Sequence, residues 1–298
     1  MADRIPAGLG QAQRERLAYI DFRLYFLGEI TRADITARFG VAPTGATRDL
    51  SMYRESAPEN IVFDGSSKTY RIGPGFRALF DHQLDRALSA LSQGFGDGLG
   101  GASRGLVTCE FPEPMNRPAI ETLALVTRAI RNRSVLSVSY VSLSSGKSRR
   151  EIIPFALVDN GLRWHVRAFD RKSEEFRDFV LTRIEAAHLV PEALPKEIEH
   201  PENDIQWNRI VELELVPHPN GPRPDVSALD YSMENGVLRM QLRAALAGYV
   251  LRRWSVDCSP DHSLRGPEYR LWLRDPLALY GAGSSALAPG YVVPRGIP

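Results

Sequence analysis

The chain has little cysteine: only Cys109 and Cys258 occur among its 298 residues. They stand far apart and have no partners at the spacing of metal ligands, which argues against a disulfide framework and against a zinc site. The chain also has no apolar run long enough to cross a bilayer, and no apolar segment of the secretory type at its N-terminus. We therefore expect a protein of a reducing, cytoplasmic compartment that binds no cofactor and no metal.

The chain also lacks an excess of charge of either sign, because 37 Lys and Arg balance 36 Asp and Glu. The distribution is uneven, however. Residues 119–191 hold 12 basic and 8 acidic residues, a net charge of +4, whereas residues 192–298 hold 11 and 14, a net charge of −3. A hydrophobic content of 43% is ordinary for a globular protein, and 298 residues are enough for two or three domains. The middle of the chain is thus its most basic part.

Two stretches of this middle part, between residues 162 and 184, combine strand patterning with arginine. They read L-R-W-H-V-R-A-F-D and F-R-D-F-V-L-T-R-I. Successive side chains of a strand point to opposite faces, so His165 and Arg167 share a face of the first strand, and Arg177 and Arg183 share a face of the second. A β-structured core does not need arginine, but guanidinium groups bind phosphate or carboxylate oxygens in pairs. The pattern predicts an anion site on which these arginines converge.

The N-terminal part has the pattern of a winged helix-turn-helix. Apolar residues at three- and four-residue spacing predict a first helix over residues 11–27. Thr31 and Asp34 have the spacing of a capping box that opens a second helix, and Pro43 stands where the first turn of a third would begin. Alternation over residues 61–72, around D-G-S-S, predicts a hairpin. This element order is that of a winged helix-turn-helix.

We expect the third helix to enter the major groove of DNA. Its outer face combines short hydrogen-bonding side chains, a glycine that lets the backbone come close, and an arginine, which suits contact with bases and phosphates. A solvated helix face or a protein-binding module is the alternative, but the face lacks the mixture of Glu and Lys that is typical of a helix face exposed only to solvent. Two cations of the hairpin could reach phosphate, although a solvated hairpin explains them almost as well. The predicted DNA-binding residues are Thr44, Gly45, Thr47, Arg48, Ser51, Lys68 and Arg71.

The predicted fold is a multidomain α+β protein, with the winged helix-turn-helix in residues 1–80. Residues 81–118 indicate a linker with one short helix and a glycine-rich stretch. Residues 119–193 indicate a helix and five short strands, a combination typical of small Sm-like or SH3-like β-barrels. Residues 194–280 indicate a small α+β domain, and residues 281–298 a poorly ordered tail. The five central strands are expected over residues 135–142, 149–158, 162–169, 176–181 and 184–190.

Taken together, these motifs resemble those of the WYL-domain transcription factors of bacteria. The W-Y-L tripeptide appears as W-H-V at residues 164–166. The matching surroundings are Y-x-S from Tyr140, S-S-G from Ser144, R-x-x-x-P from Arg150 and the stretch F-R-D-F-x-L-x-R-I. The W-H-V-R variant is similar to the repressors encoded beside phage-defence islands, such as those of BREX and CBASS systems. The resemblance covers roughly residues 10–280.

The resemblance implies a homodimer that binds an inverted-repeat operator in double-stranded DNA and represses the downstream genes. It also implies that the WYL domain senses an anionic ligand, such as a nucleotide or single-stranded nucleic acid, which alters the affinity for DNA. For Arg177 and Arg183, structural ion pairing with Asp178, Glu185 or Asp170 is the competing explanation, and Arg150 could belong to a solvated pair with Arg149. By motif position the ligand-binding residues would be Tyr140, Ser142, Ser144, Arg150, His165, Arg167, Arg177 and Arg183.

Other function classes have less support in the sequence. Ser144 and Ser145 stand in no G-x-S-x-G pattern, and no nucleophile, base and oxyanion donor gather, so we expect no catalysis. An RNA- or single-strand-binding adaptor that acts through the barrel is the main alternative to the repressor. A pure protein-interaction module is the third. Affinities for duplex and single-stranded nucleic acid distinguish the three.

Overall fold

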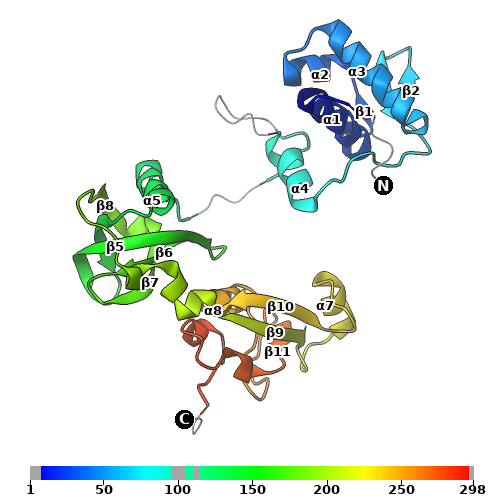
Figure 1. Ribbon diagram of the computed structural model, residues 1–298. Helices are drawn as coiled ribbons and strands as arrows, with labels where there is room; N and C mark the ends of the chain where they lie inside the picture. The colour runs from blue at the N-terminus through cyan, green and yellow to red at the C-terminus, as the bar shows by residue number, and fades with distance from the viewer. Residues whose placement is uncertain (1–7, 96–104, 111–114, 295–298) are drawn as a thin grey trace. The chain divides into compact units, whose positions relative to one another are not determined.

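Figure 1 shows the computed structural model, which describes residues 8–95, 105–110 and 115–294. The chain forms two compact units, Met1–Pro112 and Glu113–Pro298, and each is described by itself. The glycine-rich stretch of the predicted linker falls largely on residues 96–104, which lie outside the described residues. In the described ranges, no helix is both long enough and apolar enough to span a bilayer.

The first unit contains the three helices and the hairpin that the sequence predicts, followed by a fourth helix. Their bounds are α1 Gln11–Leu27, β1 Glu29–Ile30, α2 Arg32–Phe39, α3 Pro43–Ser56, β2 Ile61–Asp64, β3 Thr69–Ile72 and α4 Leu84–Gln93. The hairpin strands β2 and β3 pair antiparallel, and β1 pairs with the other edge of β3. The three helices pack around one apolar core, in which α1 contributes the fully buried Leu17, Ile20 and Leu24.

Local signals set where these helices begin and end. The Thr31 hydroxyl accepts a hydrogen bond from the Asp34 N–H (3.2 Å), and the Asp34 carboxylate accepts one from the Thr31 N–H (2.7 Å). The predicted capping box therefore opens α2. Pro43 is the first residue of α3, as predicted. Gly28 and Gly40 end α1 and α2 with φ angles of 77° and 64°, which glycine adopts at little cost.

Helix α4 belongs to the packed part of the first unit. Ala87 and Ala90 of α4 are buried against Phe22 of α1. The segment predicted as a linker, residues 81–118, thus starts with a helix that packs on the winged helix-turn-helix. The reason is that α4 is amphipathic and its small residues let it lie close to α1.

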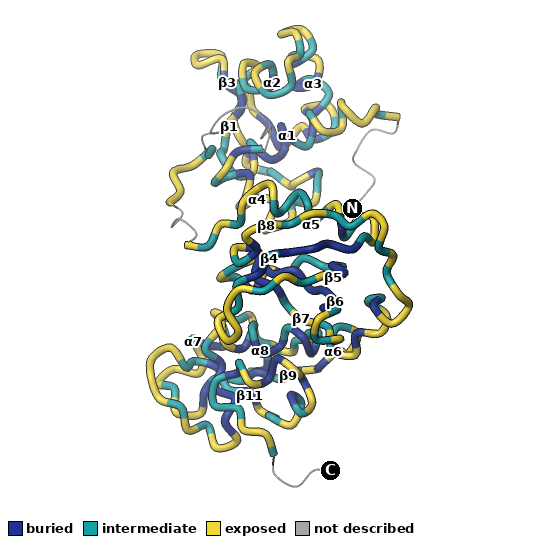
Figure 2. The backbone as a smooth tube through the Cα atoms, turned by 90° about the vertical axis from the view of Figure 1, so that its left-hand side faces the viewer, coloured by how far each residue is buried: buried dark blue, intermediate teal, exposed yellow. Residues whose placement is uncertain are grey.

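The second unit begins with a helix and a five-stranded antiparallel sheet. Their bounds are α5 Ile120–Asn132, β4 Leu136–Ser142, β5 Gly146–Asp159, β6 Trp164–Asp170, β7 Glu175–Val180 and β8 Ile184–Leu189. The strand order is β7-β6-β5-β4-β8. Val126 and Ala129 of α5 pack on one face of the sheet, against Leu136 and Val166. The strand segments that form this core are dark blue in Figure 2.

The predicted Sm-like or SH3-like barrel is not confirmed. Closure would require pairing between the edge strands β7 and β8, and in the described residues these strands pair only with β6 and β4, respectively. The two edge strands are joined by a single 3-10 turn, Leu181–Arg183. The sheet therefore curves so that its edges meet at that corner without forming a ladder. The observed architecture is an open, curved sheet covered by α5.

The rest of the second unit is the small α+β domain that the sequence predicts. Its elements are α6 Ile205–Asn208, β9 Ile210–Pro217, α7 Pro224–Asp230, β10 Leu238–Arg243, α8 Ala244–Arg253 and β11 Leu271–Leu273. The sheet has the order β10-β9-β11, with both pairings antiparallel. Leu213 of β9, Leu251 of α8 and Leu273 of β11 are among the fully buried residues of its core.

The prediction of a poorly ordered tail from residue 281 is wrong for its first part. Ala282 and Ala288 are 3% and 5% exposed and belong to the core of the C-terminal domain. The Ser284 hydroxyl accepts a hydrogen bond from the Gly248 N–H (2.9 Å) and donates one to the Ala244 carbonyl (2.6 Å), both in α8. Small residues, which suggested disorder in the sequence, instead allow the chain to pack directly on the helix.

Candidate nucleic-acid interface and ligand site

Helix α3 presents the predicted DNA-contacting residues on its accessible side. Thr44 and Arg48 are exposed, and Gly45, Thr47 and Ser51 are partly exposed. Arg48 has no ion-pair or hydrogen-bond partner in the described residues. Its guanidinium group is therefore available to a base edge or a phosphate, while the opposite face of α3 is buried in the core.

The hairpin holds its two predicted cations at and beside its turn. Lys68 is exposed and adopts a φ angle of 54° in the turn. Arg71 is also exposed, and its Nε atom lies 3.4 Å from the Asp64 carboxylate. Hydrogen bonds from Ser66 and Ser67 hold the pKa of Asp64 below its usual range, so this carboxylate stays ionised. Lys68 is thus the freer of the two cations for a phosphate.

Two buried carboxylates fix α3 on α1. Asp21 of α1, which has no exposed surface, accepts a hydrogen bond from the Tyr53 hydroxyl of α3 (2.5 Å) and lies 2.9 Å from Nε2 of His82. Nearer the start of α3, Asp49 pairs with Nε of Arg16 at 2.6 Å. These contacts hold α3 on α1 at two positions. No sequence pattern singled them out, because each joins residues far apart in the chain.

The strand register distributes the predicted ligand-binding residues over both faces of the five-stranded sheet. Arg167 stands opposite Asp178, and Arg177 stands opposite the next residue along β6. Directly opposed residues share a face, so Arg167 and Arg177 project to different sides. Arg150 lies on the side of Arg177, whereas His165 lies on the side of Arg167. The expectation that these guanidinium groups converge on one pocket is therefore wrong.

On the side of the sheet that carries Arg150 and Arg177, both arginines are paired within the protein. Arg150 forms an ion pair with the buried Asp170, and Nη2 of Arg177 lies 2.7 Å from the exposed Glu175 carboxylate. Tyr140 is a core residue, 7% exposed, and its hydroxyl oxygen accepts a hydrogen bond from the Val180 N–H of β7 (3.2 Å). Both arginines thus have a partner within the protein, Arg177 with an acid other than the three expected, and the ligand role of all three residues stays a prediction.

Ser142 and Ser144 lie at the tip of the β4–β5 hairpin. Their hydroxyl oxygens are 3.1 Å apart and share a hydrogen bond, and the Ser142 hydroxyl also accepts the Ser144 N–H at 3.2 Å. This arrangement closes the turn before Gly146. Contact with a ligand stays a prediction for both serines.

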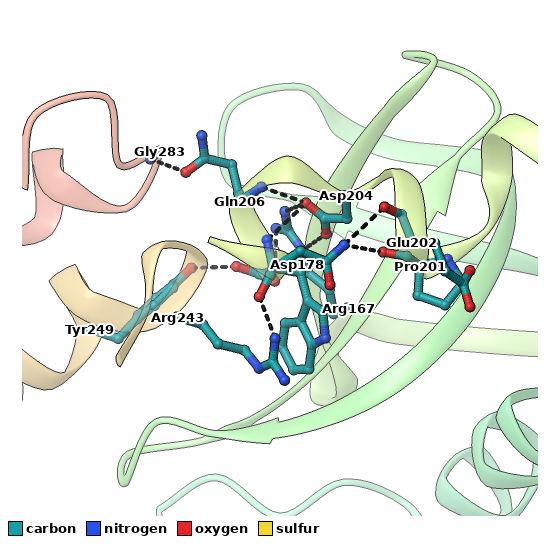
Figure 3. Close-up of polar contacts among 11 residues, drawn as sticks. Arg167, Asp178, Pro201, Glu202, Asp204, Gln206, Arg243, Tyr249 and Gly283 are labelled. Atoms are coloured by element: carbon teal, nitrogen blue, oxygen red, sulfur yellow. Dashed lines mark hydrogen bonds and ion pairs between the residues drawn. The ribbon is translucent and has the colours of Figure 1, made fainter. Parts of the chain in front are cut away.

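On the second side, Arg167 is the centre of a buried polar network (Figure 3). The residue is 6% exposed, and its Nε and Nη2 atoms bind the two Asp204 oxygens at 2.8 and 3.1 Å. Its Nη1 atom binds Asp178 at 3.2 Å, and the Tyr249 hydroxyl of α8 donates to the other Asp178 oxygen at 3.3 Å. We call Arg167, Asp178, Asp204 and Tyr249 the polar joint, because it connects the sheet to the C-terminal domain.

The negative charge of the polar joint disfavours the binding of an anion to Arg167. One guanidinium group faces two carboxylates, and burial raises the pKa of Asp178 although Arg167 beside it acts in the opposite direction. A further negative group would add to this excess. Arg167 thus has structural partners within the protein, and its ligand role stays a prediction that these contacts disfavour.

His165 and Arg183 have different surroundings from Arg167. His165 is 1% exposed, and its Nδ1 atom is buried without a hydrogen-bond partner in the described residues. Burial, then Arg163 and Arg183, lower the pKa of His165 from 6.5 to about 4, so the ring is neutral. Arg253 of α8 lies against Gly161, in the turn before β6.

Arg163 and Arg253 were not among the predicted site residues. Arg163 has a signal in the sequence, because it alternates with His165 and Arg167 on one strand face. Arg253 has none, because it follows β6 by a long stretch of chain and reads as an ordinary surface residue at the end of a helix.

Three family descriptions match successive parts of the chain. Residues 12–93 match the BrxR transcriptional regulator winged helix-turn-helix domain, residues 121–189 the WYL domain, and residues 210–279 the BrxR transcriptional regulator C-terminal dimerization domain. The predicted class is thereby confirmed: the chain is a WYL-domain transcriptional regulator with a winged helix-turn-helix in front of the WYL domain.

Curated relatives named DNA-binding transcriptional repressor CapW are similar over most of the chain. The protein of Escherichia coli strain KTE188 is 33% identical and that of Pseudomonas aeruginosa 32% identical, each over 88% of this chain and 88% of its own length. The protein of Stenotrophomonas maltophilia is 31% identical over 82% of this chain and 84% of its own. The chain belongs to the CapW family.

A solved structure, the proteasome accessory factor B/C (PafBC) of Arthrobacter aurescens, aligns with 93% of this chain and 46% of its own. The sequence identity is 15% and the TM-score 0.28, which is too low to support an argument.

Proposed function

We propose that the protein is a sequence-specific repressor of transcription that binds an inverted repeat in double-stranded DNA as a homodimer. The carrying observation is the accessible face of α3, with an unpaired Arg48 and short polar neighbours on a helix anchored to α1. The name of the CapW relatives supports the same function. The match to a dimerization domain supports the homodimer, which would present two α3 helices to one duplex.

The proposal includes a response to a ligand through the WYL domain. A ligand of negative charge fits the vicinity of His165 and Arg183, where cations outnumber carboxylates, better than the polar joint. The regulated genes would be those of a phage-defence operon, as the resemblance implies, and the protein would act in the cytoplasm. Ligand binding can shift the affinity for DNA only by its differential affinity for the two states of the repressor.

Replacement of Arg48 tests the DNA-binding role. We expect Arg48→Ala to weaken binding to the DNA upstream of the protein's own gene by about 1–3 kcal/mol, the typical contribution of an arginine that reads a guanine. Fluorescence anisotropy with a labelled duplex measures the affinity. Arg239→Ala is the matched control, because Arg239 is an exposed arginine of β10 and makes the same change in net charge.

Two results would contradict the proposal. One is an Arg48→Ala protein that binds the duplex as tightly as the wild type. The other is a wild-type protein that prefers single-stranded DNA or RNA of the same sequence, which would favour the adaptor function instead.

A further inference from the structure

A cavity of about 580 Å³ opens in the first unit, between α1, the end of α2 and α4. Its volume falls within the usual range of small-molecule sites, roughly 300–1,000 Å³. Small side chains leave this space, because Ala18 of α1 and Ala87 and Ala90 of α4 line it where larger residues would fill the gap. Among the described residues that line the cavity, none is a predicted DNA-binding or ligand-binding residue. The cavity is therefore distinct from both predicted sites.

The walls of the cavity are aromatic. Tyr19 and Phe22 of α1 are buried, and each contacts the Phe95 ring edge to face, with centroids 5.0 and 4.9 Å apart. Phe39, the last residue of α2, packs on Tyr19 in the same way at 5.4 Å. Phe80 lines the cavity from the segment before α4. Such walls favour a flat aromatic molecule, because aromatic rings attract one another edge to face or in offset stacks.

Cations outnumber acids in the lining of the cavity. Arg14 of α1 and Arg86 of α4 are exposed, and the side chain of neither has an ion-pair or hydrogen-bond partner in the part of the chain that the structure describes. The acids of the lining are Glu15 and Asp81, both exposed. With Arg38, three guanidinium groups thus line the cavity beside two carboxylates. The exposed rim therefore favours a negative group.

Arg38 connects the aromatic walls to this positive charge. Its Cζ atom lies 5.4 Å from the centroids of both the Phe39 and the Phe95 ring. A guanidinium group is flat and delocalised, so it stacks on aromatic faces. An aromatic surface and positive charge consequently meet in one cavity.

We propose that this cavity is a binding site for a planar aromatic anion, whose ring packs against Tyr19 and Phe22 and whose negative group binds the arginines of the rim. Guanidinium groups form charge-assisted hydrogen bonds with carboxylate and phosphate alike, so an aromatic acid and a nucleotide share the chemistry that the cavity recognises. The site lies within the winged helix-turn-helix unit and is separate from the ligand response proposed for the WYL domain. Its occupancy does not rest on the proposed function.

Isothermal titration calorimetry of the full chain tests the site with two anionic probes. Indole-3-acetate represents an aromatic acid and adenosine monophosphate a nucleotide, and we expect saturable binding of at least one of them to the wild type. The probe that binds more tightly distinguishes the two sources. The neutral counterparts, indole-3-acetamide and adenosine, keep the ring but lack the charge, so we expect each to bind roughly tenfold more weakly than its anion.

Three variants locate the binding in this cavity. We expect Arg14→Gln and Arg86→Gln each to weaken the binding of the anion roughly fivefold, because each removes one exposed charge from the rim. Ala18→Leu should weaken the binding of the anion and of its neutral counterpart by roughly tenfold or more, because the larger side chain occupies the space of the ring. Arg32→Gln is the matched control, since it removes the same charge from an exposed position of α2 outside the lining.

A melting experiment separates loss of the site from loss of the fold. We expect Ala18→Leu to melt at the wild-type temperature or above it, because filling a cavity commonly stabilises a protein. If Ala18→Leu melts at a lower temperature, the two arginine variants decide, because they change only exposed side chains.

The proposal is overturned if neither anion binds the wild type, or if the neutral counterpart of the anion that binds has the same affinity. It is also overturned if Arg14→Gln and Arg86→Gln both bind as the wild type does, if a stably folded Ala18→Leu does so, or if Arg32→Gln weakens binding equally.

Discussion

The neighbours of each arginine decide what it can bind. Arg167 is 6% exposed and faces the carboxylates of Asp178 and Asp204, whereas Arg253 is exposed and lies against a glycine. Burial, which disfavours the charged form, is the main reason that the pKa of Asp178 is raised, and the nearby Asp204 acts in the same direction. One cation with two carboxylates also leaves an excess of negative charge at the polar joint, which an anion at Arg167 would increase.

Acid sensitivity is a second property that belongs to a single residue, His165. Burial, then Arg163 and Arg183, lower its pKa from 6.5 to about 4. The unfolded chain therefore binds this proton at a higher pH than the folded chain does, and the free energy of unfolding falls as the pH drops from 6.5 to about 4. The effect amounts to at most about 3 kcal/mol. We expect His165→Gln, which cannot titrate, to lose less stability over this window.

Urea unfolding at about pH 7 and about pH 4.5, followed by tryptophan fluorescence, measures the difference. His188→Gln serves as the control, because His188 is an exposed residue of β8. If the wild type and His165→Gln lose the same stability between these pH values, His165 is not the group responsible.

Sequence alone finds the face on which a residue lies, but not its partner. The alternation in L-R-W-H-V-R places His165 and Arg167 on one side of a strand, and the register confirms this. It cannot reveal that Asp204, in a polar and proline-bearing segment further along the chain, pairs with Arg167, or that Tyr249 of α8 lies beside His165. Such pairs depend on how distant elements pack, so the convergent site predicted from spacing divided over two faces of the sheet.

At the scale of elements, the short helix α6 connects the sheet and the C-terminal domain. The Asp204 carboxylate accepts the N–H groups of Gln206 and Trp207, both at 3.1 Å, and so caps α6 while it binds Arg167. The Gln206 amide donates a hydrogen bond to the Gly281 carbonyl (3.0 Å) and accepts one from the Gly283 N–H (2.7 Å). The Trp207 ring lies under Arg243 of β10, with 4.5 Å from Cζ to the ring centroid. One carboxylate therefore holds both the start of a helix and a buried cation.

We expect Asp204→Ala to destabilise the second unit by about 3–5 kcal/mol, the usual effect of leaving a buried charge without its partner. The change also removes the cap of α6, whereas Asp204→Asn keeps a capping oxygen and should cost less. Charge reversal at Arg167 should be as damaging as Asp204→Ala, because it would place three carboxylates together. Chemical denaturation measures each free energy of unfolding.

Asp225→Ala is the control for these variants, because the Arg223–Asp225 ion pair is exposed and should contribute between zero and about 1 kcal/mol. If Asp204→Ala were no more destabilising than Asp225→Ala, the polar joint would not hold the two domains together.

Elements with local signals were predictable, and those that depend on distant partners were not. Helix α1 has the predicted bounds, and α2 and α3 begin where the sequence predicts, because glycine, proline and the Thr31–Asp34 capping box act within a few residues. The five strands were predictable for the same reason. Whether the sheet closes could not be predicted, because closure depends on a contact between β7 and β8. The ordered packing of residues 281–288 could not be predicted either, because it depends on α8.

At the scale of the whole molecule, the chain combines a winged helix-turn-helix domain, a WYL domain and a segment that matches a dimerization domain. The proposed repressor needs all three, because two copies of α3 act on one duplex only if a second chain is attached. The net charge of +1 gives no general attraction to DNA, so specific binding must come from local contacts and from the pairing of two chains.

Insertion of about five base pairs, half a turn of B-DNA, between the two half-sites of the operator tests this pairing. The insertion turns one half-site to the opposite side of the duplex, so that a homodimer with both α3 helices on one side can engage only one of them. We expect the affinity to fall roughly a hundredfold, since the second contact benefits from the high effective concentration that the first provides. A gel shift with the native and the altered operator measures the ratio, and the same insertion outside the inverted repeat is the control. Equal affinity for both operators would mean that each chain binds its half-site alone, and the homodimeric mode of binding would have to be abandoned.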